Sequence, residues 1–435
     1  MIDLSQSSLA FAKEKDSSDA LSVFRNRFYI PEIKGKPVLY FCGNSLGLQP
    51  KKVKQYIEQE LNDWAVWGVE GHFHARTPWF SYHEFLREPM AKIVGAFPDE
   101  VVVMNTLTTN LHLMMISFYR PEKKRYKIIC EGGAFPSDQY ALASQVTMHG
   151  FDPATSIVEL FPLPGNTYVE TSQVLDAINR HKDELALVMI GGVNYYSGQL
   201  FDLPAITSAA HQAGAMAGFD LAHAAGNVML HLHDWEVDFA VWCSYKYLNG
   251  GPGGVAAAFV HRNHTGNPKL VRLAGWWGND PASRFTMPKE FVPAPSADAW
   301  QLSNAPVLPM AALRASLDLF DEAGMEKLTE KSRELTAYME YVIRQAVESS
   351  NCEKEISIIT PRDENQRGCQ LSVQFRSEGR KVYDLLTDRL VFGDWRSPDV
   401  IRFAPVPLYN SFDDVYQCGQ ILSEVLREVF KKADR

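Results

Sequence analysis

One lysine of this chain stands where lysine is unusual, after an apolar stretch. In VDFAVWCSYKYLNGGPGG (237–254), Lys246 follows a run typical of a buried strand and precedes a glycine-rich turn. Lysine is almost never fully buried without a partner. Desolvation and neighbouring charge favour its neutral amine, which is the form that makes a Schiff base with a carbonyl compound. The simpler interpretation of this segment alone is a lysine just past the strand end, with its ammonium group in solvent.

A second predicted strand also ends in polar residues. The segment AMAGFDLAH (215–223) places Asp220 and His223 at a strand's carboxyl end. A buried carboxylate there could keep a pyridinium nitrogen protonated, which lets a pyridoxal ring act as an electron sink. His223 could pack against that ring or hydrogen-bond the aspartate. Taken alone, the pair is equally typical of a capping aspartate and a structural histidine.

Two helix starts could complete a site for a phosphorylated ring. Residues 105–109 (NTLTT) lie between a predicted strand and a helix, where backbone N–H groups can bind phosphate, although a simple N-cap is the alternative. Phe135 opens FPSD (135–138) before another helix and could stack on a planar ring. The turn GGPGG (250–254) has neither GxGxxG nor GKS/T spacing, so it supports no dinucleotide or P-loop site.

The elements that must position these residues alternate regularly. Between residues 101 and 261, short apolar runs alternate with amphipathic stretches, which predicts a mainly parallel sheet covered on both faces. Ligands of such folds lie at the carboxyl ends of strands. Beyond residue 305, the segment 308–350 predicts one long helix or two, and a weaker αβ pattern follows. We therefore expect a second, smaller domain that begins near residues 300–310.

Composition excludes several classes of protein. The 435 residues predict two or three domains, and 43 basic against 52 acidic residues give a net charge of −9, which argues against a nucleic-acid partner. The longest apolar run, 185–193, is far short of the ~20 residues that a membrane helix needs. The six cysteines form no CxxC pair and are typical of reduced thiols, and the first residues lack a signal-peptide pattern. We expect a cytoplasmic protein without a membrane partner.

Nine segments resemble, in order, segments of the kynureninase family of fold-type I pyridoxal-phosphate enzymes. They are FCGNSLGLQP (41–50), WGVEGHF (67–73), NTLTTNLHLM (105–114), FPSDQYA (135–141), FDLAHAAGN (219–227), CSYKYLNGGPGG (243–254), GWWG (275–278), QLSNAP (301–306) and IRFAPVPLYNSF (401–412). The resemblance implies an α/β fold of the pyridoxal-phosphate transferase type, with a mainly parallel seven-stranded sheet in the large domain and a smaller C-terminal α/β domain. We expect an N-terminal segment (1–60) packing with the small domain, a large cofactor-binding domain (61–305) and the small domain (306–435).

The resemblance also implies which residues surround pyridoxal 5′-phosphate. Lys246 would form the Schiff base with the cofactor and later move protons, and Asp220 would pair with the pyridine nitrogen. Tyr245 would contact the phosphate and donate a proton to the departing fragment. The other implied cofactor contacts are Leu107, Thr108, Phe135, Asp138, Ser197, His223, Trp276 and Asn304. The family presents the tryptophan from a partner subunit, which implies a homodimer with shared sites, and the string GWWG favours Trp276 over Trp277.

The substrate contacts implied by the resemblance are Ser45, His72, Asn304 and Arg402. Arg402 would hold the substrate's α-carboxylate through a bidentate pair; without the resemblance, a surface ion pair is the alternative. Animal-type members have the His72 and Asn304 combination around the aryl ring, and polar groups can recognise a ring hydroxyl. We therefore hypothesise activity on 3-hydroxykynurenine, preferred over kynurenine, whereas the alternative is that both residues only position the substrate.

The reaction implied is hydrolytic cleavage of a carbon–carbon bond. L-kynurenine or 3-hydroxy-L-kynurenine, intermediates of tryptophan catabolism, would give anthranilate or 3-hydroxyanthranilate plus L-alanine. The nearest rival within the fold is a cysteine desulfurase or an aminotransferase. A desulfurase needs a cysteine on a mobile C-terminal loop, but Cys369 and Cys418 fall in a predicted strand and helix. A non-catalytic member of the fold is the other alternative, against which Lys246, Asp220 and Arg402 argue.

Two further patterns could indicate other chemistry. His72-x-His74 and His231-x-His233 have the spacing of metal-binding pairs on strands, but neither has a carboxylate cluster such as HExxH nearby. We expect no metal site. Cys243 could be a nucleophile, although its segment VWCS fits a buried strand thiol better.

Overall fold

The computed structural model describes residues 8–430. Within them, seven strands form one large sheet in the order β4–β10–β9–β8–β7–β5–β6. Only β10 runs antiparallel to its neighbours there, so the expected mainly parallel sheet is confirmed. The strands are β4 (Val101–Val103), β5 (Lys127–Glu131), β6 (Ile157–Leu160), β7 (Leu185–Gly191), β8 (Met216–Asp220), β9 (Phe239–Trp242) and β10 (Ala257–Val260).

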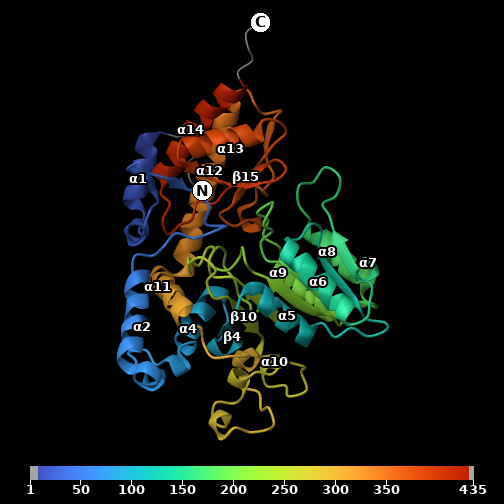
Figure 1. Cartoon of the computed structure of the whole chain (residues 1–435). Helices are drawn as coiled ribbons and strands as arrows, with labels where there is room; N and C mark the ends of the chain where they lie inside the picture. Colours follow the sequence, from blue (N-terminus) through green and yellow to red (C-terminus); the bar gives the residue numbers. More distant parts are fainter. Residues whose placement is uncertain (1–7, 431–435) are drawn as a thin grey trace.

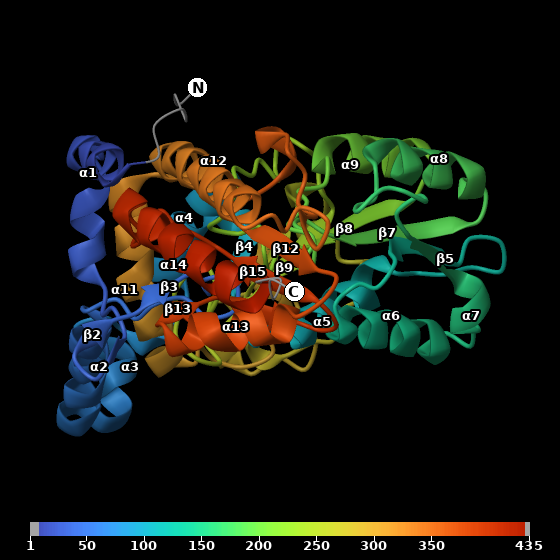
Figure 2. The ribbon, with the colours of Figure 1, turned by 90° about the horizontal axis from the view of Figure 1, so that it is seen from above.

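Both faces of this sheet are buried because successive side chains on a strand point to opposite sides. Val101 and Val103 belong to one hydrophobic cluster, whereas Val102 belongs to another. Figure 2 shows α8 and α9 on one face and α5 and α6 on the other. These helices are α5 (Leu107–Phe118), α6 (Pro136–Met148), α8 (Thr171–His181) and α9 (Leu203–Gln212), with the short α7 (Pro153–Ser156) and α10 (Arg262–Thr265) beside them. The covered sheet brings the strand ends together at one edge.

The C-terminal part forms the smaller α/β unit at the top of Figure 1. An antiparallel sheet in the order β11–β12–β15–β14 packs with three helices. The elements are α12 (Met325–Ser349), β11 (Ile356–Ile358), β12 (Leu371–Phe375), α13 (Gly379–Asp388), β14 (Asp394–Arg396), β15 (Val400–Phe403) and α14 (Phe412–Phe430). Segment 308–350 is two helices rather than one, because Gly324, with φ 77°, separates α11 (Val307–Ala323) from α12.

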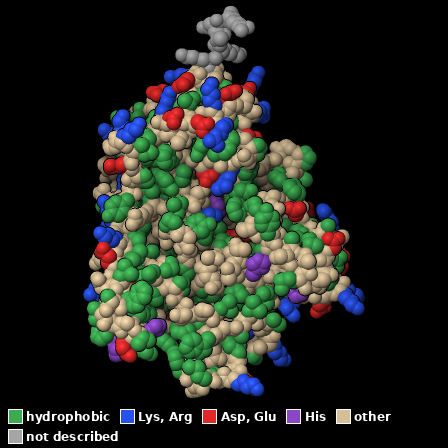
Figure 3. All heavy atoms as spheres, in the orientation of Figure 1, with side chains coloured by type: hydrophobic (Ala, Val, Ile, Leu, Met, Phe, Trp, Pro, Cys, Tyr) green, Lys and Arg blue, Asp and Glu red, His purple; other side chains and the backbone are tan. Residues whose placement is uncertain are grey.

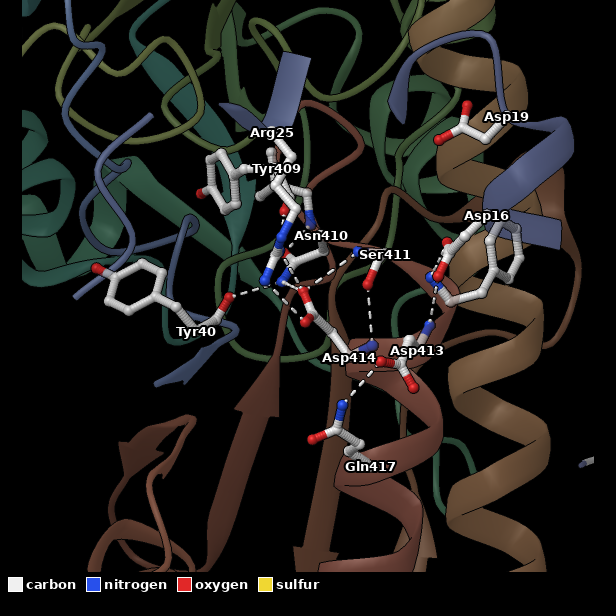
Figure 4. Close-up of polar contacts among 12 residues, drawn as sticks. Asp16, Asp19, Arg25, Tyr40, Tyr409, Asn410, Ser411, Asp413, Asp414 and Gln417 are labelled. Carbon is white, nitrogen blue, oxygen red and sulfur yellow. Dashed lines mark hydrogen bonds and ion pairs between the residues drawn. The ribbon is translucent and has the colours of Figure 1, made fainter. Parts of the chain in front are cut away.

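The N-terminal segment contacts both parts of the chain. Helix α1 (Leu9–Ser18) packs on α14, and β3 (Leu39–Tyr40) pairs in parallel with β13 (Val391–Phe392). Asp16 accepts the backbone N–H groups of Phe412 and Asp413 at the start of α14 (Figure 4). Other N-terminal elements are β1 (Glu32–Ile33), β2 (Lys36–Pro37), α2 (Val53–Trp67), α3 (Gly71–His74) and α4 (Glu84–Val94), of which α2 and α4 pack on α11. The domain limits at residues 60 and 305 stay predictions.

Strand β9 ends at Trp242, and Lys246 lies in the turn beyond it, as the sequence pattern predicts. Two other local expectations were wrong. His72 and His74 lie in the helical turn α3, where neighbours two apart point in different directions, so they do not form a strand-type pair. Cys369 precedes β12 instead of lying within it. Among residues 8–430, no helix has the length and apolar character needed to cross a membrane.

Candidate active site

A pocket of ≈ 180 Å³ lies where the strand ends and helix starts of the large domain meet. The residues at its wall come from the start of α5, the start of α6, the end of β8 and the turn after β9. The sequence-predicted residues brought together here are Leu107, Thr108, Phe135, Asp138, Asp220, His223, Tyr245 and Lys246. Segments more than a hundred residues apart therefore converge on one cavity.

One end of the pocket is the start of helix α5. Its N-cap, Thr106, has extended backbone geometry, and within the described chain no side chain caps the first turn. The Thr106 hydroxyl instead contacts that of Thr109, at 3.1 Å between the two Oγ1 atoms. The first N–H groups of a helix have no intrahelical partner and carry the positive end of its dipole. Leu107 and Thr108 therefore offer backbone donors to an anion.

A set of carboxyl groups lines another part of the pocket. Burial and the neighbouring Asp220 raise the pKa of Asp138 well above its usual range, and its carboxyl hydrogen-bonds Asp220. Burial also raises the pKa of Asp220, which accepts the Ala222 N–H at 2.7 Å. Because two carboxylates cannot both ionise at such close range, Asp138 holds the proton and Asp220 carries the charge. Burial raises the pKa of Glu131 to about 7 as well.

The turn that carries Lys246 is fixed from the N-terminal segment. The Gly47 N–H donates to the Tyr245 carbonyl at 2.8 Å, and the Asn249 N–H donates to the Lys246 carbonyl at 3.0 Å. A Cβ at Gly47 would lie 2.3 Å from the Lys246 carbonyl oxygen, so only glycine permits this approach. The Lys246 Nζ is 5.8 Å from the centre of the Phe135 ring, which places the amine beside an aromatic face.

Two polar side chains close to Lys246 keep their neutral forms. Burial and the positive charge of Lys246 lower the pKa of His223 well below its usual range. Its Nδ1 is buried and has no hydrogen-bond partner among the described residues. Burial raises the pKa of Tyr245, so its hydroxyl keeps its proton at neutral pH. Tyr245 can therefore serve as a proton donor.

Arg402 lies on β15 behind one wall of the pocket, fully buried. Its Nη1 donates to the carbonyl of Tyr195, a residue of the pocket wall, at 2.6 Å. Its Nη2 donates to Ser45 Oγ at 3.1 Å and lies 2.9 Å from Asp394 Oδ2. The predicted substrate residues Ser45 and Arg402 are therefore in direct contact.

Comparison with known proteins gives a consistent result. The kynureninases of Myxococcus xanthus and Flavobacterium psychrophilum are 53% and 52% identical, and these matches cover 98% and 97% of this chain and 99% of each relative. The kynureninase of Nematostella vectensis is 48% identical, covering 96% of this chain and 94% of its own. Residues 328–422 match the family model of the kynureninase C-terminal domain. The chain belongs to the kynureninase family.

Solved structures show how widely this fold is used. The cysteine desulfurase CsdA of Escherichia coli superposes with a TM-score of 0.71 at 16% identity, covering 94% of this chain and 98% of its own. The cystine C–S lyase C-DES, in complex with cysteine persulfide, gives a TM-score of 0.73 at 16% identity, covering 88% and 97%. This kynureninase-family chain therefore has the fold of the fold-type I pyridoxal-phosphate enzymes, and the expected fold class is confirmed.

The pocket fits the cofactor that kynureninases use, pyridoxal 5′-phosphate. The uncapped start of α5 provides donors for a phosphate, and Asp220 provides an anion for a pyridinium nitrogen. Phe135 and the unpartnered Nδ1 of His223 flank the space between them. Lys246 places an amine at the same pocket, where it could react with the cofactor's aldehyde.

Six sequence-predicted residues do not line this pocket: Ser45 and Arg402, which lie behind its wall, and Ser197, His72, Asn304 and Trp276. Ser197 is buried and bonds Asn194, with 3.1 Å from its Oγ to Asn194 Oδ1. His72 holds the Val69 carbonyl through Nδ1 at 2.9 Å. Asn304 is exposed and lines a separate cavity of ≈ 330 Å³, whose wall also includes Thr106, the N-cap of α5. Trp276 is 50% exposed, whereas Trp277 is 2% exposed, so only Trp276 is free to meet a partner.

The pocket also contains residues that the sequence analysis missed. Glu131 is the last residue of β5, and its two carboxyl oxygens accept the Gly191 N–H at 3.1 Å each. Its position after the apolar run KIIC matches that of Asp220 after its own strand, and this was the available signal. Tyr195 meets Phe135 edge to face, with 5.3 Å between ring centres. Nothing in its local sequence distinguished Tyr195 from Tyr196.

The thiols and the histidine clusters lie outside this chemistry. Burial raises the pKa of the Cys243 thiol, and it raises those of Cys369 and Cys418 to about 12. These thiols are protonated and unsuited to nucleophilic attack. A separate group, Glu100, His233 and His261, could place one ligand atom each within 4.8 Å of the others, and none of them lines the pocket. That no metal takes part in the site stays a prediction.

Proposed function

We propose that the chain hydrolyses the Cβ–Cγ bond of L-kynurenine and 3-hydroxy-L-kynurenine. The products are L-alanine and anthranilate or 3-hydroxyanthranilate, and pyridoxal 5′-phosphate is the cofactor. The observation that carries this proposal is the convergence of Lys246, Asp220 and the uncapped start of α5 on one pocket, in a chain of the kynureninase family. The expected roles of these residues follow from that arrangement.

When bound, pyridoxal 5′-phosphate supplies an electron sink for the bonds of the substrate's α-carbon. Lys246 holds the cofactor and moves the proton at the α-carbon, since its amine is the basic group at the pocket wall. Asp220 carries the negative charge that Asp138 stabilises by keeping its own proton. Tyr245 keeps its hydroxyl proton and donates it to the departing fragment. Arg402 orients the substrate through its α-carboxylate, and Ser45, which accepts a hydrogen bond from Arg402 at 3.1 Å, contacts the substrate near its aryl ring.

The preference for the 3-hydroxylated substrate is a finer part of the proposal. His72 and Asn304 supply polar groups for a ring hydroxyl, but neither lines the pocket of its own chain. A polar pocket that bonds a hydroxyl discriminates strongly against a substrate that lacks it. The preference therefore requires that another copy of the chain bring these residues to the site.

A homodimer with shared sites is supported by an exposed aromatic surface. Phe73, Phe285 and Trp276 are 60%, 50% and 50% exposed. Phe80 connects Phe73 to Phe285, with ring centres 5.8 and 4.9 Å apart, and Phe285 lies 5.5 Å from Trp276. Figure 3 shows hydrophobic side chains gathered on the lower part of the molecule. We call Phe73, Phe80, Phe285 and Trp276 the aromatic face. If a second copy of the chain covers this face, Trp276 and His72, which precedes Phe73, would lie near the pocket of that second copy.

A cytoplasmic location is also part of the proposal. The six cysteines all lie within the described residues and are free. Free thiols in this number are typical of a reducing compartment.

The test is turnover of L-kynurenine and 3-hydroxy-L-kynurenine side by side. Alanine and aryl acid are quantified separately, with Lys246→Ala as the inactive control. We expect equimolar products, absent in the control, and a higher kcat/KM for the hydroxylated substrate. His72→Ala should reduce that ratio, whereas His74→Ala, an exposed neighbour in the same turn, should not. Absence of alanine from both substrates would overturn the activity, and a preference for unsubstituted kynurenine would overturn only the specificity.

A further inference from the structure

In the small domain, the carboxylate of Asp394 contacts two arginines, Arg396 and Arg402, beside the pocket. Asp394 and Arg396 stand two residues apart on β14 and so share one face of the strand. Asp394 faces Arg402 directly across the β14–β15 pair. Its Oδ2 lies 2.9 Å from Arg402 Nη2, and its Oδ1 lies 3.0 Å from Arg396 Nε. One carboxylate therefore bridges two guanidinium groups.

The charge balance of this group bears on substrate binding. Arg402 is completely buried and paired with Asp394. That pair alone has no net charge, so it would attract an incoming carboxylate weakly. Arg396 adds a second positive charge, which leaves one positive charge in excess over the three side chains. The pKa of His223 in the pocket wall is lowered mainly by burial and Lys246, and further by Arg402 and Arg396. The charges of both arginines therefore act on a residue of the pocket.

The rest of the guanidinium of Arg402 is also held in place. Nη1 is fixed by the Tyr195 carbonyl, and Nη2 is shared between Asp394 and Ser45. Its Nε is buried without a hydrogen-bond partner in the described chain. A fixed guanidinium with one unpartnered nitrogen, Nε, is suited to a further acceptor of defined position. Asp394 supplies the orientation, at the cost of a negative charge close to where the substrate carboxylate must bind.

We propose that Arg396 is a positioning residue for recognition of the α-carboxylate: it offsets the charge of Asp394, so that Arg402 keeps both its orientation and its attraction for the substrate. The inference rests on the proposed role of Arg402 in substrate binding. It assigns Asp394 and Arg396 opposite effects on affinity, although they form one ion pair. The side chain of Arg396 is 35% exposed, so it can be replaced without opening the core.

The test measures binding rather than turnover. Holoenzyme variants Arg396→Gln, Arg396→Lys and Asp394→Asn are titrated with two ligands, and binding is followed through the absorbance of the bound cofactor. L-alanine carries the α-carboxylate, and kynuramine is the substrate amine without it. Arg380→Gln is the matched control, since Arg380 is a small-domain arginine paired with Asp384 at 3.0 Å on the exposed side of α13.

We expect Arg396→Gln to weaken L-alanine binding about tenfold, the effect of one partly screened charge at this range. Kynuramine binding should stay within about twofold, and Arg396→Lys should retain most of the affinity for L-alanine. Asp394→Asn keeps a hydrogen-bond acceptor but removes the negative charge, so it should tighten L-alanine binding. A purely structural role would weaken both ligands in every variant.

Three results would overturn the inference: unchanged L-alanine binding in Arg396→Gln, equal losses for both ligands, or weaker L-alanine binding in Asp394→Asn. The wild-type protein separates this question from the proposed function. If it binds L-alanine but releases no aryl acid from kynurenine, the proposed activity fails, while the comparison of the two ligands still decides whether Arg396 supports carboxylate recognition.

Discussion

Asp138 hydrogen-bonds Asp220 at the wall of the pocket, and burial raises the pKa of both carboxyl groups. The pair therefore holds one proton, on Asp138, and one negative charge, on Asp220. The backbone N–H of Ala222 adds a second donor to that charge at 2.7 Å. Among residues 8–430, no cationic side chain forms an ion pair with Asp220, so this stabilised anion could accept a pyridinium nitrogen.

Replacement of Asp138 tests this assignment of the proton. Asp138→Asn keeps a donor to Asp220, so its activity should stay within about tenfold of the wild type. The activity of Asp138→Ala should fall about 10- to 100-fold, which corresponds to the loss of a hydrogen bond to a charged group. Cofactor affinity, measured by titration of the apoenzyme, should follow the same order. Equal losses in both variants would show that Asp138 does not act as a protonated donor.

Glu131 should make the apoenzyme less stable as the pH rises. Its folded-state pKa is raised to about 7 from 4.5, so the folded chain keeps a proton that the unfolded chain loses. Stability contributed by this group is present at low pH and is lost as the pH rises toward 7, by about 3 kcal/mol in total. Glu131→Gln still accepts the Gly191 N–H but cannot ionise. The melting temperature of the variant should therefore exceed that of the wild type at pH 7.5 and match it at pH 5; identical profiles would contradict the shift.

Asp238 should stabilise the fold most strongly in mildly acidic solution. It accepts His211 Nε2 at 2.9 Å and His264 Nε2 at 2.7 Å. Burial alone would raise its pKa, but the hydrogen bonds from these histidines and the Ala217 N–H lower it, and the bond to Asp238 raises the pKa of His211. The contribution of His211 is complete below a pH near 6.5 and is lost as the pH rises through its raised pKa.

Thermal unfolding of Asp238→Asn at pH 5.5 and pH 8 measures that contribution. We expect a loss of about 2 kcal/mol at the lower pH, because one buried charged hydrogen-bond centre is removed, and a smaller loss at the higher pH. Asp234→Asn is the control, since Asp234 is exposed four residues away. A loss that does not depend on pH would mean that the bond to Asp238 does not raise the pKa of His211.

Arg25 fixes the N-terminal segment to the start of α14. It contacts the two carboxylate oxygens of Asp414 at 2.6 and 3.0 Å, and Asp414 also accepts from Asn410 (Figure 4). Arg25→Gln leaves this buried carboxylate without its cation and should cost about 2 kcal/mol, less than a fully buried pair because the arginine is partly exposed. Arg27→Gln, which removes an exposed pair with Glu322, should cost under about 0.5 kcal/mol in the same denaturant titration. Similar losses in both variants would contradict this difference.

The strand-end residues of the pocket could be predicted because parallel strands end at one edge of a sheet. Asp220 and Lys246 each follow an apolar run, and the helix starts near Thr108 and Phe135 follow strands of the same sheet, so their convergence needed no tertiary information. Glu131 follows the same rule and was overlooked, because a single acidic residue after a strand is also typical of a solvent-exposed strand end.

The carboxylate side of the site depends on strand register, which the sequence does not display. Asp394 lies opposite Arg402 only because β14 pairs with β15 in one particular alignment. The segment GDWR (393–396) has no apolar pattern that would predict a strand. His72, Trp276 and Asn304 do not line the pocket for a different reason. They were predicted from the family resemblance alone, and a single chain does not bring them to the site.

A mixing experiment should therefore decide whether Trp276 acts in the neighbouring subunit. Lys246→Ala removes the amine from one chain, and Trp276→Ala removes the aromatic contact from another, so each homodimer alone should be inactive or nearly so. In a mixed dimer, one site combines the intact Lys246 of one subunit with the intact Trp276 of its partner. Equal amounts give half mixed dimers with one native site in two, so about a quarter of wild-type activity should return if subunits assemble at random.

The alternative assignment predicts a different result. If Trp276 serves the pocket of its own chain, every site in the mixture keeps one defect and no activity returns.

Phe285→Asp places a charge on the aromatic face and should shift the protein toward the monomer in sedimentation, with loss of activity that depends on protein concentration. Phe161→Asp, which alters another residue with 59% exposure outside that face, should leave the sedimentation profile unchanged.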